Sequence, residues 1–307
     1  MTAYLSELES RGTEFGPAPV LIAADCEAAM KRAARTMEAS GIRVADKVGI
    51  GDAPERIELQ AAASAVWIEL EMDGGAAMDR LLAHVSRDAD AGRYSAIVSG
   101  RTGQIDVLAA HLGDSAVELI VDADDAERAA ALALALAVKG GSMLLSDVAS
   151  DRSAARLRQL SDEVGRIAAT LARLSAGPAA SRPVAEPAGS GVAPDVSADS
   201  VRSVIRARRL RARFFPEELF ADPAWDMLLD LLQAEIAQLR VPVSSLCIAA
   251  AVPATTALRW LKTMAQQGLF VRRADPHDGR RVFVELAPDS SRAMRLYFAE
   301  VGNLPVI

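Results

Sequence analysis

The stretch VSSLCIAAAVPATTALRWLKTMAQQGLFVRRADPHDGRRVFVELAPDSSRAM, residues 243–294, decides the fold of the C-terminal third of the chain. It predicts a short helix over 244–251 and a second over 254–267, which Pro253 opens and Gly268 ends. Two β-rich runs, LFVRRAD and RRVFVELA, then flank the turn PHDG and predict a hairpin. Upstream, apolar residues at helical spacing predict an amphipathic helix over 223–238. The predicted order is three helices and a hairpin with arginines on both sides of its turn.

That order is the order of a winged helix-turn-helix. The segment closely resembles the MarR family of regulators in its two-helix turn, in the junction QGLFVRR, and in Asp278 and Arg280 at the wing tip. The resemblance covers about a third of the chain. It implies a winged-helix fold that binds double-stranded DNA, and it says little about the ligand or the target sequence.

Helical geometry separates the two faces of the predicted helix 254–267. Leu258, Leu261 and Met264 point toward the core, which leaves the polar residues on the side facing the DNA groove. Arg259 fits guanine O6 and N7, and Arg280 resembles the family's minor-groove arginine, which Asp278 would orient. The predicted DNA-contacting residues are Thr255, Thr256, Arg259, Lys262, Arg272, Arg273, Asp278, Arg280 and Arg281.

Six arginines lie between Arg202 and Arg213. On a helix they would flank the DNA backbone while an apolar side packs, although a solvated basic helix explains them equally well. The residues predicted to pack are Val201, Val204, Ile205 and Leu210.

Charge divides the 307 residues in two, although the net charge is only −7. Residues 201–298 carry 15 Lys and Arg against 10 Asp and Glu, and residues 1–200 carry 19 against 30. We therefore expect only the C-terminal part to meet a polyanion. Two distant cysteines, no apolar run long enough for a membrane span and no signal peptide predict a cytoplasmic protein.

Between the two halves, residues 150–175 predict a dimerisation helix and residues 176–200 a flexible linker rich in Pro, Gly, Ala and Ser. The helix carries apolar residues at alternating spacings of three and four, which is the narrow stripe of a parallel coiled coil. A helix packed on the preceding domain is the other interpretation. The seam consists of Leu157, Leu160, Val164, Ile167, Leu171 and Leu174.

The first 140 residues alternate short apolar runs with helical stretches. Runs such as VLIA, VWIEL and AIVS predict parallel strands buried on both faces. The expected strands are 19–24, 42–48, 65–70, 95–99 and 117–121, and the expected helices are 27–40, 53–62, 75–88, 104–112 and 126–139. Five such units predict a small doubly wound domain.

Acidic residues at the strand ends resemble the receiver domain of response regulators. Asp25 follows the first strand and Ser99 ends the fourth, but Glu69 stands at the phosphoacceptor position and Asp122 where the family has lysine. The resemblance implies a degenerate receiver that is not phosphorylated, with two like charges near each other. Ordinary polar residues at strand ends are an equally good interpretation.

Together these features predict a dimeric transcription regulator: a receiver-like domain, a coiled-coil helix, a linker, and a winged helix over residues 201–307. The receiver-like domain would dimerise or contact a partner protein or signal. No catalysis, metal or cofactor is expected, because neither a nucleotide-binding motif nor a metal-ligand cluster occurs. The alternatives are a phosphorylatable two-component regulator, and a small-molecule α/β enzyme that uses the winged helix for protein contacts.

Overall fold

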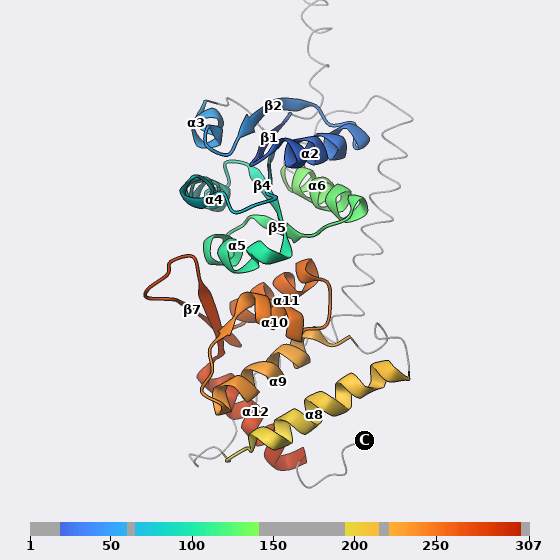
Figure 1. Ribbon diagram of the computed structural model, residues 1–307, viewed down its shortest axis with the longest axis vertical. Helices are drawn as coiled ribbons and strands as arrows, with labels where there is room; N and C mark the ends of the chain where they lie inside the picture. Colours follow the sequence, from blue (N-terminus) through green and yellow to red (C-terminus); the bar gives the residue numbers. More distant parts are fainter. Residues whose placement is uncertain (1–18, 60–64, 141–193, 215–220, 302–307) are drawn as a thin grey trace, which may run out of the picture. The chain divides into compact units, whose positions relative to one another are not determined.

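The computed structural model describes residues 19–59, 65–140, 194–214 and 221–301, and Figure 1 labels the helices and strands. These residues belong to one compact unit that holds an α/β part, residues 19–140, and a C-terminal part, residues 194–301. The predicted coiled-coil seam, residues 157–174, lies outside the described residues and stays a prediction.

The α/β part is built on five parallel strands in the order β2-β1-β3-β4-β5, the order of one common doubly wound fold. Every residue of β1 and β3 is buried, as expected of strands covered on both faces. The predicted five-stranded parallel sheet is confirmed, and each strand begins and ends within two residues of its predicted bounds. The strands are β1 (Val20–Ala24), β2 (Val44–Gly49), β3 (Ala65–Glu69), β4 (Ser95–Gly100) and β5 (Glu118–Val121).

Helices cover both faces of this sheet (Figure 1). Side chains alternate along a strand, so Val20 and Ile22 of β1 pack with one pair of helices and Leu21 and Ala23 with the other three. The pair is α2 (Glu27–Ala39) and α6 (Asp125–Gly140), and the three are α3 (Ala53–Glu58), α4 (Gly75–Asp90) and α5 (Ile105–Leu112), which follows the short turn η1 (Thr102–Gln104).

The C-terminal part has the predicted order of helices and hairpin, with a three-stranded sheet in the order β6-β8-β7. The two helices of the helix-turn-helix meet at a bend of 108°, which is typical of that motif. Gly268 follows the second helix with a φ of 73°, a conformation that glycine adopts without strain, so the predicted end is confirmed. The elements are α8 (Ala198–Leu210), η2 (Arg211–Arg213), α9 (Pro223–Ile236), β6 (Val241–Pro242), α10 (Val243–Ala249), α11 (Ala254–Gln266), β7 (Phe270–Ala274), β8 (Val282–Leu286) and α12 (Pro288–Val301).

Two expectations for the start of this part need correction. Helix α8 begins at Ala198, within the predicted linker, and Val196 just before it is already buried. Leu210 was expected to pack beside Val201 but is 44% exposed. The reason is geometric: nine residues are two and a half helical turns, so Leu210 lies on the opposite side of α8.

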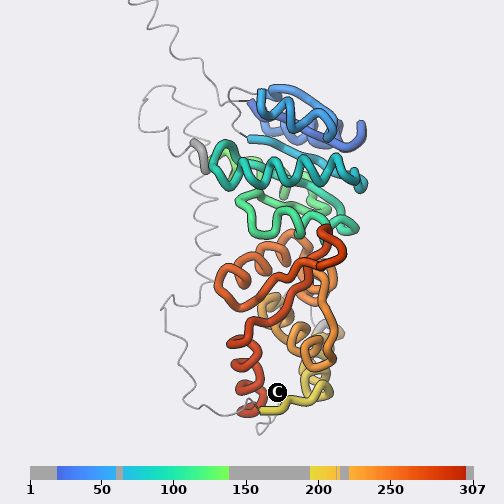
Figure 2. Tube along the Cα trace, turned by 90° about the vertical axis from the view of Figure 1, so that its left-hand side faces the viewer, coloured from blue at the N-terminus to red at the C-terminus, as the bar shows by residue number. Residues whose placement is uncertain are grey.

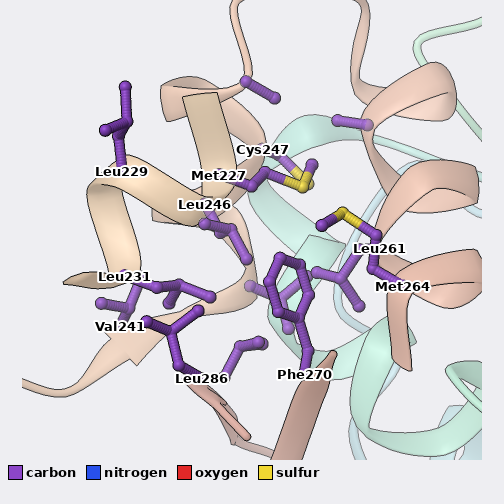
Figure 3. Packing of buried hydrophobic residues seen from close by; sticks show 14 of the residues in the cluster. Met227, Leu229, Leu231, Val241, Leu246, Cys247, Leu261, Met264, Phe270 and Leu286 are labelled. Atoms are coloured by element: carbon purple, nitrogen blue, oxygen red, sulfur yellow. The ribbon is translucent and has the colours of Figure 1, made fainter. Parts of the chain in front are cut away.

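A single apolar cluster joins the helix-turn-helix to the wing. Figure 3 shows Leu246 of α10, Leu261 and Met264 of α11, and Phe270 of β7 around its centre, all 3% exposed or less. The same cluster continues into the α/β part through three buried residues, Ile105, Ala109 and Val121. The helix-turn-helix therefore rests on α5 and β5.

Candidate functional site

Thr255, the first predicted DNA contact on α11, lies against the edge strand of the five-stranded sheet. Its hydroxyl accepts a hydrogen bond from the backbone N–H of Val121 at 2.9 Å and lies 3.3 Å from the carbonyl oxygen of the same residue. Only 3% of Thr255 is exposed. The side chain thus pairs backbone groups of β5 that an edge strand would otherwise leave open.

The two basic residues that follow on α11 reach the same edge of the sheet, Arg259 at β5 and Lys262 at the loop that precedes it. Arg259 Nε donates to Glu118 Oε1 at 3.0 Å, and its Nη2 contacts the same oxygen. Lys262 Nζ donates to the carbonyl oxygen of Ser115 at 2.5 Å. Thr255, Arg259 and Lys262 are spaced by four and three residues, so they share one face of α11, and in this structure that face touches the α/β part.

The wing adds three further ion pairs to this contact. Arg272 Nη1 lies 2.9 Å from Asp114, and Arg280 lies 2.5 Å from Asp73 through Nη2 and 3.2 Å from Asp79 through Nε. We call these pairs, together with the contacts of α11, the edge contact. Figure 2 shows the orange and red segments of α11 and the hairpin beside the green segment that holds α5 and β5.

A glycine makes room for one of these pairs. A Cβ added to Gly113, directly after α5, would collide with Nη1 of Arg272 and stand 2.6 Å from the carbonyl oxygen of Ala109. Burial lowers the pKa of Arg272, and the charge of Asp114 only partly offsets this effect. For Arg280 the hydrogen bond to Asp73 outweighs burial and raises the pKa of the arginine. The same hydrogen bond lowers the pKa of Asp73.

Three of the other four predicted DNA contacts lie on the wing, and Thr256 lies on α11. Arg273 pairs with Glu285 at 2.5 Å and Arg281 with Asp278 at 3.5 Å, and both arginines are more than 60% exposed. Thr256 is half-buried. Asp278 accepts from the backbone N–H of Arg280 at 3.0 Å, so the predicted orienting of that guanidinium falls to Asp73 and Asp79 instead. The structure leaves the DNA roles of all nine residues as predictions.

A second cluster lies at the carboxyl ends of the parallel strands. Glu69 is 1% exposed. Its carboxylate accepts hydrogen bonds from the two terminal nitrogens of Arg128, Nη1 and Nη2, at 2.7 and 2.8 Å. Arg32, Trp67 and Ser99 also donate to it, at 2.8, 2.9 and 3.2 Å. Burial alone would raise the pKa of Glu69, but the hydrogen bonds from Arg128 and Arg32 outweigh burial and hold it below its ordinary value.

The expected pair of like charges is arranged differently. Two carboxylates near each other, Glu69 and Asp122, would raise the pKa of one of them if the pair were buried, but Asp122 is exposed. Instead Glu69 binds the two arginines, while Asp122 accepts from Thr102 and pairs with Arg101, and the pKa of Asp122 is also lowered. Arg32 and Arg128 are not among the residues predicted from the sequence. Each lies on a helix that follows an acidic strand end, but this signal is weak for Arg32, because Lys31 and Arg35 lie on the same helix.

Asp25 occupies the remaining corner of this predicted site. Its Oδ2 accepts from the backbone N–H groups of Glu71 and Met72 at 2.8 and 2.7 Å. The four predicted receiver-like positions thus flank the same end of the sheet, but among their side chains only those of Ser99 and Glu69 are hydrogen-bonded to each other.

Cys247 is buried in the core, and burial, aided by the charge of Asp106, raises its pKa to about 12. Within the part of the chain that the structure describes, no three His, Cys, Asp or Glu side chains are grouped as metal ligands. Over the same residues, no single helix has the length and apolar character to cross a membrane.

No protein-family model matches the sequence, and no curated protein matches it. Solved structures match about a third of the chain. BpsR of Bordetella bronchiseptica, whose DNA binding is regulated by 6-hydroxynicotinic acid, is 21% identical over 34% of this chain and 82% of its own, with a TM-score of 0.21. The transcriptional regulator Tm0710 of Thermotoga maritima is 19% identical over 34% and 78%, and the adhesin competence repressor of Streptococcus pyogenes is 13% identical over 34% and 73%, both at a TM-score of 0.21.

Proposed function

We propose that this chain is a sequence-specific transcription regulator that binds double-stranded DNA and is not an enzyme. One observation carries the proposal: the second helix of the helix-turn-helix and the wing together present a face that binds carboxylates through Arg259, Arg272 and Arg280. A face that binds anions on a fold of this element order is what DNA reading requires. On DNA, Arg259 would pair with guanine and Arg280 would enter the minor groove.

Recovery of the DNA bound to the full-length tagged protein across a genome tests this function and yields the preferred site. On that site we expect Arg259→Ala to cost about 1–3 kcal/mol of binding free energy and to relax the preference at one base pair. Arg35→Ala and Arg87→Ala, which remove exposed arginines of α2 and α4, are the matched controls. Equal losses for Arg259→Ala and the controls, or no enriched site, would refute the assignment.

Dimerisation through residues 157–174 belongs to the same proposal. The heptad spacing of its six apolar residues supports a parallel coiled coil. Aspartate at both Val164 and Ile167 would place unpaired charge in the seam and should yield monomers by light scattering. A monomeric wild type at micromolar concentration would contradict this part.

For the α/β part we propose a receiver-like domain that is not phosphorylated and that contacts a partner protein or signal. The strand order and the engagement of both Glu69 oxygens by Arg128 support it, because a carboxylate held in this way is a poor nucleophile. Incubation with acetyl phosphate and Mg²⁺ should leave the protein unlabelled. Stoichiometric labelling would favour the two-component alternative.

A further inference from the structure

We propose that the edge contact is autoinhibitory: the acidic edge of the α/β part occupies the DNA-reading face of α11 and the wing, so that face binds either this edge or DNA. The inference rests on the proposed function. It assigns a role to four acids, Asp73, Asp79, Asp114 and Glu118, that the function itself leaves unexplained.

Steric exclusion is the first argument. A reading helix must enter a major groove about 12 Å wide, which leaves no room for a protein strand on its reading face. Yet Thr255 is 3% exposed and bonded to the backbone of Val121, and Lys262 is bonded to that of Ser115. DNA can reach this face only after β5 has left it.

Charge complementarity is the second argument. Arg259 and Arg272 of the reading face each pair with one acid, and Arg280 pairs with two. Phosphates of DNA would bind the same side chains. The α/β part belongs to the half of the chain with 30 acids and 19 Lys and Arg, so it is the acidic partner throughout. An anionic ligand of the same side chains therefore competes with DNA directly.

Two of the ion pairs in the contact are open to water, whereas Arg272 beside Asp114 is only 12% exposed. Arg259 and Glu118 are 55% and 28% exposed, and Arg280 and Asp73 are 32% and 54% exposed. Exposed ion pairs contribute little to stability. Closure lowers the apparent DNA affinity by the fraction of molecules that are open, so weakening the pairs should raise that affinity.

The test uses the full-length chain and a mixed-sequence DNA duplex as the probe. The variant Asp73→Asn/Asp79→Asn/Asp114→Asn/Glu118→Gln removes the four carboxylates and leaves every DNA-reading side chain in place. The matched control neutralises four exposed acids of the α/β part that take no part in the edge contact: Glu38→Gln, Asp52→Asn, Glu55→Gln and Asp125→Asn. We expect the first variant to bind the duplex about tenfold more tightly than wild type, and the control to bind within about twofold of it.

Hydrogen exchange of the Val121 amide gives a readout that does not depend on affinity. This N–H donates to Thr255, so its protection should fall when DNA saturates the wild-type protein. Equal affinities of wild type and variant, with Val121 still protected in the complex, would overturn autoinhibition while leaving DNA binding intact. No binding by either protein would overturn the proposed function, and autoinhibition with it.

Discussion

The molecule uses arginine–carboxylate pairs in two places with opposite consequences. In the Glu69 cluster the side chains of Glu69 and Arg128 are 1% and 4% exposed, and every oxygen of the carboxylate is engaged. In the edge contact, Arg259 and Glu118 are 55% and 28% exposed. The chemistry is the same, but water can replace a partner only at the edge contact. The first cluster is therefore a fixed part of the α/β core, and the second is a contact that can dissociate.

The largest effect should come from breaking the buried pair. Arg128→Met leaves Glu69 charged in the core with only Arg32 as a cation, and this should cost about 3–5 kcal/mol in the free energy of unfolding. Arg101→Met removes the exposed pairs with Glu71 and Asp122 and should cost about 1 kcal/mol or less. Urea denaturation of both variants measures the difference, and similar losses would show that burial does not separate the two kinds of pair.

The second-largest effect should be a loss of stability of the Glu69 cluster at low pH. The pKa of Glu69 in the folded protein lies below its ordinary value, so the unfolded chain takes up this proton first as the pH falls. The stability that the charge contributes is complete above the ordinary pKa and is lost as the pH falls through the folded pKa. We expect the gap in unfolding free energy between wild type and Glu69→Gln to narrow on acidification below about pH 4. A gap independent of pH would contradict the lowered pKa.

A smaller effect is expected from the neutral hydrogen bond in the edge contact. Thr255→Val keeps the shape of the side chain but leaves the Val121 N–H without its acceptor, at a cost of about 1–3 kcal/mol if the contact stays closed. If the contact opens easily, water satisfies that N–H and the cost falls below this range. Thr263→Val, which alters an exposed hydroxyl within α11, is the control. Denaturation midpoints of the two variants decide between a closed and an open edge.

The sequence predicts the helices and strands of both regions but not which arginine pairs with which carboxylate. Buried runs and helical spacing are local patterns, so the strands of the α/β sheet and the helices and hairpin of the C-terminal part could be located within a few residues. Arg259 and Glu118 are 141 residues apart, and Arg128 and Glu69 are 59 apart. Charge alone does not say which arginine meets which acid across such distances. The division into a basic and an acidic half was the nearest signal of the edge contact.

The smallest effect should be the coupling between single partners of the edge contact. In a double-mutant cycle of Glu118→Gln and Arg259→Gln, the coupling in unfolding free energy should be about 0.2–1 kcal/mol at low salt. It should vanish toward 1 M salt, where the screening length is about 3 Å. A cycle of Glu69→Gln and Arg128→Met should keep most of its coupling under the same conditions, because salt screens buried pairs far less. If the Glu118–Arg259 coupling survived high salt, the edge contact would have to be a fixed interface, and competition with DNA for that face would be ruled out.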